Sequence, residues 1–138
     1  MDRLPLRLPP GVDLRRALED AAARPGMESA FVVAGIGSLV EARLRYAGAA
    51  TDSVVAGPLE ILTLSGTLGA SGAHLHMAVS DASGRVSGGH VGYGNTVRTT
   101  AELLLVALSD WSLTREHDPA TGFHELVIRP RGGTRHAA

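Results

Sequence analysis

The most constraining stretch of the chain is residues 73–91, which hold three of its six histidines on either side of a turn signal. His74 and His76 are two residues apart, so on an extended strand both imidazoles leave from the same face. The residues that alternate with them, Leu75 and Met77, leave from the other face. This alternation predicts a strand with one polar face and one core face.

The turn signal is Asp-Ala-Ser-Gly at residues 81–84, and a three-residue loop that ends on a left-handed glycine is a common hairpin closure. Such a loop pairs Asp81 with Arg85. Counting back along both strands then places His90 directly opposite His76, and three imidazoles converge on one face. A loop one residue shorter would turn His90 to the other face, so the metal hypothesis depends on this register.

Three neutral imidazoles form an open metal site, which leaves a fourth position for water, substrate or another ligand. Histidines on a solvated sheet face need no metal, and that alternative holds for a lone His-x-His pair, but the third histidine favours a metal. The chain contains no cysteine, so any metal must be held by His, Asp or Glu. We therefore predict a divalent metal, Zn before Fe, Mn or Ni, at His74, His76 and His90.

The composition limits the remaining classes. The chain has 138 residues, 44% of them hydrophobic, which suits a single domain with an ordinary core. Its thirteen basic residues are all arginines and face fourteen acids, for a net charge of −1, which argues against a strong bare nucleic-acid binder. Residues 1–10 contain no apolar run, so we expect no secretory signal and no membrane span, and a cytoplasmic protein.

Patterning predicts one helix among many strands. The helix begins after Asp13, a plausible N-cap, and ends at Pro25. Residues 101–108 have helical propensity but equally fit a buried strand. His117 and His124, at a predicted bend, are interpreted as surface residues. Strands are expected over residues 3–8, 29–39, 40–46, 59–68, 111–116 and 123–129, with loops at 47–56 and 92–96.

Two more residues are candidates for catalytic roles. Glu60 lies inside the apolar run 59–68, where its carboxylate either faces solvent or is held in a polar pocket, and the sequence supports both interpretations equally. In a pocket near the histidines it could ligate the metal, orient a ligand or act as a general base. Arg98 could steady a substrate carboxylate. Both roles are inferred from sequence position alone.

A wider pattern comprises the early helix and residues 35–38, 59–66, 74–76, 88–90, 99–102 and 121–126. In this pattern the chain resembles the PPC (plant and prokaryote conserved) domain family. The resemblance implies an α+β fold, with a curved, mostly antiparallel sheet and one main helix, assembled as a homotrimer. It implies one domain over residues 1–130, a flexible tail over 131–138, and strand rather than helix over 99–108. The family's metal-binding histidines fall on His74, His76 and His90.

Three functions follow as hypotheses. The first, which we favour, is a metal-binding homotrimeric module whose pocket holds a small anionic ligand or stabilises the assembly, with any link to transcription made through partners. The second is a metal-dependent lyase or hydrolase, distantly similar to acetolactate decarboxylase, with Glu60 as base and Arg98 steadying a carboxylate. The third is a DNA-binding protein. Plant members carry a separate AT-hook for that purpose, and residues 129–135 have arginine and glycine in the wrong order for one.

Overall fold

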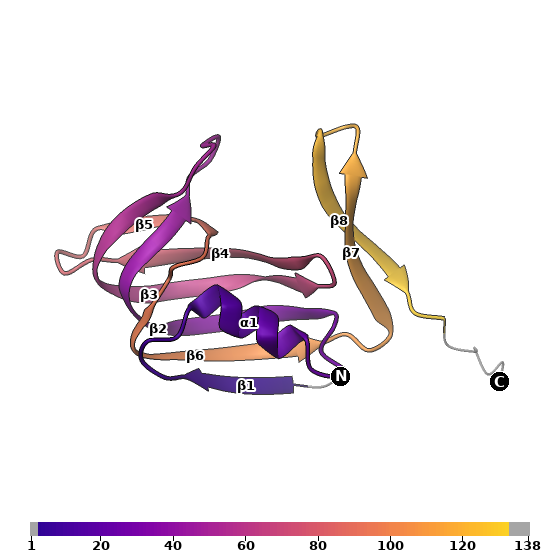
Figure 1. Cartoon of the computed structure of the whole chain (residues 1–138), viewed down its shortest axis with the longest axis horizontal. Helices are drawn as coiled ribbons and strands as arrows, with labels where there is room; N and C mark the ends of the chain where they lie inside the picture. Colours follow the sequence, from indigo (N-terminus) through magenta and orange to yellow (C-terminus); the bar gives the residue numbers. More distant parts are fainter. Residues whose placement is uncertain (1–2, 133–138) are drawn as a thin grey trace.

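A computed structural model describes residues 3–132 and contains a six-stranded sheet, one helix and a separate two-stranded hairpin (Figure 1). The strand order of the sheet is β1-β6-β2-β3-β4-β5, and every pairing is antiparallel. The expected mostly antiparallel sheet with one helix is therefore confirmed. The elements are β1 (Arg3–Leu8), α1 (Leu14–Ala22), β2 (Ala30–Arg45), β3 (Ser53–Gly69), β4 (Gly72–Ser80), β5 (Val86–Val91), β6 (Val97–Ala107), β7 (Trp111–Asp118) and β8 (Phe123–Pro130).

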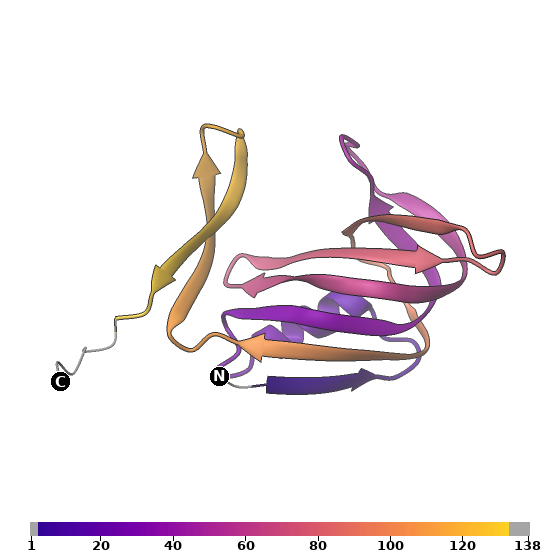
Figure 2. The same ribbon diagram turned by 180° about the vertical axis from the view of Figure 1, so that it is seen from behind.

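Helix α1 covers one face of the sheet. Asp13 is its N-cap, as predicted, and accepts a hydrogen bond from the backbone N–H of Arg16 at 3.1 Å. Leu14 and Leu18 are fully buried and share one hydrophobic core with Leu75 of β4. In the reverse view of Figure 2 the strands lie in front of the helix, so no helix of residues 3–132 covers this second face.

The sheet curls because β5 pairs with two strands. His76 of β4 lies opposite His90, while Leu44 near the end of β2 lies opposite Val91. The register of β2 against β3 shifts between Leu39 and Glu41, which marks a bulge, and bulges bend the strands that contain them. Strands β2, β3, β4 and β5 thus close on one another, as the expected curved sheet requires.

The strand expected over residues 29–39, with its continuation over 40–46, is present as one continuous strand, β2. The expected start of β3 was wrong. Residues 47–56 were expected to be a loop, but β3 already begins at Ser53 and residues 53–56 pair with 41–44 of β2. The small side chains of this segment give no strand pattern in the sequence, because the hydrogen bonds that pair it with β2 come from the backbone.

Strand β6 resolves the ambiguity of residues 101–108. They form strand, as the family resemblance implied, and their helical propensity is overridden. The strand is hydrogen-bonded to β1 on one side and β2 on the other, and its alternate residues Leu103 and Leu105 are buried. The hydrogen bonds and burial of a strand between two neighbours outweigh helical propensity, which is worth only tenths of a kcal/mol per residue.

Strands β7 and β8 confirm the predicted C-terminal hairpin, which projects from one end of the main sheet (Figure 1). Its base is held by Leu113, which is buried and donates its N–H to Ser29 Oγ at 3.0 Å. The tail predicted for residues 131–138 falls largely outside the described residues, since 133–138 are not described. No helix in residues 3–132 is long and apolar enough to cross a membrane.

Gly66 allows β4 to approach β3 at the level of His74. Its φ is +152°, and a Cβ there would overlap the His74 carbonyl oxygen and lie 2.8 Å from Leu75 Cα. We expect Gly66→Ala to lower the free energy of unfolding by about 3 kcal/mol or more, measured by urea denaturation. Gly132→Ala, where a Cβ meets no atom within 4 Å, should unfold like the wild type. Equal stability of all three proteins would contradict this account of Gly66.

Candidate metal centre

The three histidines of β4 and β5 lie on the sheet face away from α1. His76 lies opposite His90 of β5, and His74 lies opposite Thr67 of β3. Leu75 and Met77, which alternate with the histidines, are buried in the core. The hairpin closes as predicted. The Asp81 N–H donates to the Arg85 carbonyl at 3.0 Å, and the glycine of the loop has a φ of +80°.

The imidazoles converge on a common point. One ring nitrogen from each of His74, His76 and His90 lies within 4.8 Å of the others. His76 Nε2 and His90 Nδ1 are 3.2 Å apart, and the His74 ring stacks on that of His90 with centroids 5.1 Å apart. Zn–N bonds of about 2.05 Å at tetrahedral angles separate two ligand nitrogens by about 3.3 Å. The His76–His90 pair already has this spacing, and the His74 nitrogen lies within 4.8 Å of both.

The surroundings of the histidines favour their neutral form. Burial lowers the pKa of His74 to about 4, and the positive charge of Arg115 acts in the same direction, while Glu125 opposes it. Burial also lowers the pKa of His90, with further contributions from His76 and from Arg45. Metal ions bind neutral imidazole, so both rings are in the ligating protonation state at pH 7.

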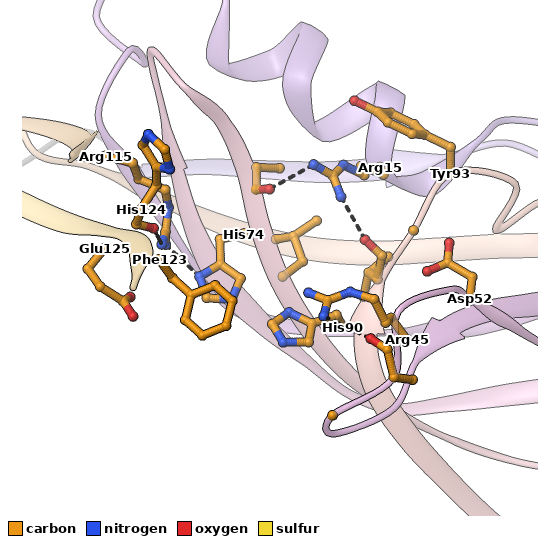
Figure 3. A pocket seen from close by; sticks show the side chains of 16 residues that line it. Arg15, Arg45, Asp52, His74, His90, Tyr93, Arg115, Phe123, His124 and Glu125 are labelled. Carbon is orange, nitrogen blue, oxygen red and sulfur yellow. Dashed lines mark hydrogen bonds between the residues drawn. The ribbon is translucent and has the colours of Figure 1, made fainter. Parts of the chain in front are cut away.

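A cavity of about 850 Å³ adjoins the histidines and is large enough for a small molecule (Figure 3). Arg45 lies beside His90 and Arg115 beside His74, on opposite sides of the cavity. Neither guanidinium has a carboxylate within 4.0 Å among the residues that the structure describes. A third cavity residue, Arg15, is satisfied instead by Glu19 at 3.1 Å and by backbone carbonyls.

Arg115 of β7 makes the closest contact to the cluster. Its Nη2 donates to His74 Nδ1 at 2.5 Å and to Thr67 Oγ1 at 3.3 Å, and its Nη1 donates to the His124 carbonyl at 3.3 Å. The sequence analysis did not single out this arginine. It is 25 residues beyond His90 in a hairpin interpreted as surface, and no local pattern signals that β7 returns to the histidines.

The two histidines of the C-terminal hairpin are surface residues, as expected. His117 and His124 face each other across β7 and β8 with ring centroids 6.0 Å apart, and both side chains are exposed. Only His124 borders the cavity.

Glu60 and Arg98 lie elsewhere in the chain. Glu60 is exposed and pairs with Ser80, four residues along β4 from His76, or about 13 Å at the usual rise per residue. Arg98 is exposed on β6, which β2 and β3 separate from β4. Neither residue lines the cavity. Within a single chain, neither is placed to act on a ligand of the histidines, so the solvent-facing interpretation of Glu60 is the one the structure has.

A family model described as the Plants and Prokaryotes Conserved (PCC) domain matches residues 1–109. The match ends before β7, so the hairpin that supplies Arg115 lies beyond it. Two proteins named Bifunctional protein GlmU, from two strains of Synechococcus sp., are 44% and 46% identical over 129 and 124 residues. These matches include 94% and 90% of this chain, which spans about a fifth of the length of these relatives (20% of each).

Three solved structures share the fold over more than nine-tenths of the chain. A hypothetical protein from Salmonella cholerae-suis is 37% identical, with a TM-score of 0.91 and 94% of each chain covered. A metal-containing protein from Archaeoglobus fulgidus is 27% identical, with a TM-score of 0.78 and coverage of 92% of this chain and 94% of that one. A proposed DNA-binding protein from Bacteroides thetaiotaomicron has a TM-score of 0.77 over 91% of each chain, and at 20% identity it shows the fold alone.

The low pKa of His74 predicts how the metal-free protein responds to acid. Its folded-state pKa of about 4 lies below the ordinary value of 6.5, so the unfolded chain binds more protons between these pH values. Stability should therefore fall as the pH drops from 6.5 toward 4, and an NMR titration should give a His74 midpoint near 4. The His74→Gln variant should lose this part of the pH dependence of the urea midpoint. A His74 midpoint at the ordinary value would refute the expectation.

Proposed function

The chain belongs to the Plants and Prokaryotes Conserved (PCC) domain family, and on that premise we propose that it is a divalent-metal-binding protein whose ion is Zn. The observation that carries the proposal is the convergence of His74, His76 and His90 within 4.8 Å on an open sheet face. The metal-containing relative from Archaeoglobus fulgidus supports it. A bound Zn would supply a Lewis acid with a free fourth position.

The cavity beside the histidines suits a small anionic ligand. Arg45 and Arg115 present two guanidinium groups without carboxylate partners among the described residues, and a divalent ion would add two more positive charges. Asp52 and Glu125 also line the cavity and offset part of this charge. Arginine binds carboxylates and phosphates through paired N–H donors, so an oxyanion is the ligand class that this lining favours.

A homotrimer is part of the proposal. Large apolar side chains at least half exposed lie on the two central strands, β2 and β3, where a covered surface is expected. A second and third copy would bury them. The exposed residues are Val33, Ile36, Val40, Val54 and Leu62.

A metal-dependent lyase or hydrolase remains the second candidate, favoured by the free coordination position of a three-histidine site. Its helper residues would have to come from the cavity, where Glu125 and Arg115 lie, and not from Glu60 and Arg98 of the same chain. DNA binding has weaker support, because a net charge of −1 without lysine offers little attraction to phosphates. We retain the expectations of a cytoplasmic location and of one domain over residues 1–130.

Metal content tests the first step. Protein purified without a histidine tag should carry about one Zn per chain by elemental analysis, and chelation should lower its melting temperature. His76→Ala should remove most of the metal because it removes one of the paired nitrogens. His117→Ala, an exposed histidine outside the cluster, should retain it. A wild-type protein with less than about a third of a metal per chain, and no uptake of added Zn, would exclude the proposal.

The assembly is tested by light scattering. The wild type should have about three times the mass of one chain, as expected for closed cyclic symmetry. Ile36→Glu should shift it toward monomer, since an exposed apolar residue of a central strand becomes charged. Arg24→Glu introduces a glutamate at an exposed position just after α1, and this variant should keep the mass of the wild type. A monomeric wild type would contradict the trimer.

A further inference from the structure

The contact between Arg115 and His74 joins two parts of the chain that the family match separates. His74 lies in the matched residues 1–109, and Arg115 comes from the hairpin beyond them. Figure 3 shows the guanidinium directed at the His74 ring from the side opposite Arg45. Apart from His74, its hydrogen bonds go only to the neutral oxygens of Thr67 and His124 among the described residues.

The chemistry of this hydrogen bond prevents His74 from binding a metal. A guanidinium can only donate, so His74 Nδ1 must accept with its lone pair. A neutral imidazole has one lone-pair nitrogen and one N–H, so Nε2 carries the hydrogen. Neither nitrogen is then available to an ion. Arg115 and a metal exclude each other on His74, whichever nitrogen would be the ligand.

The remaining pair, His76 and His90, is not blocked in this way. Their nitrogens are 3.2 Å apart, and neither ring is hydrogen-bonded to Arg115 among the described residues. Two imidazoles make a weak metal site, and completing it requires that Arg115 leave His74. A released guanidinium needs a new acceptor, because its two other hydrogen bonds are long, at 3.3 Å, and go to uncharged oxygens.

We propose that Arg115 is a latch on the metal site, and that a small oxyanion, a carboxylate or a phosphate, releases it by binding the guanidinium. This inference rests on the proposed metal-binding function and extends it. The anion holds Arg115 away from His74 while offsetting the charge of the incoming ion. Metal and oxyanion therefore bind the cavity cooperatively, each raising the affinity for the other by the same factor.

Glu125 is the acceptor within the chain that could replace an external anion. It lines the same cavity and acts electrostatically on His74. If Glu125 took the released guanidinium, metal binding would not depend on added anion. The experiment must therefore separate an external oxyanion from this carboxylate.

The test measures Zn affinity by chelator competition on the full chain, in chloride buffer and with added malonate or inorganic phosphate, after correction for the zinc bound by each anion. For the wild type we expect either anion to tighten Zn binding by about tenfold. Arg115→Met, which removes the donor and keeps the bulk, should bind Zn about tenfold more tightly than wild type without anion and respond less than about twofold to anion. Arg115→Ala repeats the measurement should the methionine variant fold poorly.

Two controls complete the design. Arg85→Gln removes an equal charge from the loop at the other end of the β4–β5 hairpin and should behave like the wild type. Glu125→Gln should keep the anion response. A long-range ¹H–¹⁵N spectrum of the metal-free protein should place the His74 hydrogen on Nε2 in the wild type.

The outcomes separate the two proposals. Zn binding that is insensitive to anion and unchanged in Arg115→Met would overturn the latch and leave metal binding intact. An anion response that is absent from the wild type and appears only in Glu125→Gln would assign the release to Glu125 and also overturn the latch. Failure of both wild type and Arg115→Met to bind Zn under every condition would reject the metal-binding function itself.

Discussion

The register between β4 and β5 is the constraint on which the site depends. The Asp81 carboxylate fixes the loop by accepting hydrogen bonds from the N–H groups of Ser83 and Arg85 at 2.8 and 2.9 Å. The same register buries Leu75 and Val91 on the core face. A slip by one residue would expose this apolar set and turn the histidines inward, so the packing of the core stabilises the arrangement of the site. Hydrophobic burial and the convergence of the imidazoles are two results of one pairing.

The electrostatic character of the site comes from its position beside three arginines. Burial and neighbouring positive charge lower the pKa of His74 and of His90, and the same charge makes the cavity attractive to oxyanions. The cavity thus places nitrogen ligands suited to a cation next to arginine donors suited to an anion. In the proposed function, lone pairs of the imidazole rings would bind the cation, and N–H donors of the guanidinium groups would bind the anion.

Features encoded within about twenty consecutive residues were predictable from the sequence. The cap at Asp13, the alternation of residues 73–79 and the loop after Asp81 each follow from local rules. The start of β3 and the curl that brings β5 to β2 depend on distant backbone pairing, which leaves no local signal. Arg115 was missed for the same reason. The roles of Glu60 and Arg98 were inferred from sequence position alone, which does not determine how far apart two strands of a sheet lie.

The histidines stand on the face of the sheet that α1 leaves bare, while the core packs on the other face. The framework therefore owes none of its interior contacts to the ion-binding side chains. During evolution, a descendant can exchange these three residues and retain the architecture, and another can acquire a different ion without rebuilding its interior. The hairpin reaches the same bare face through Arg115, so ligand choice can change there while the interior of the scaffold stays the same.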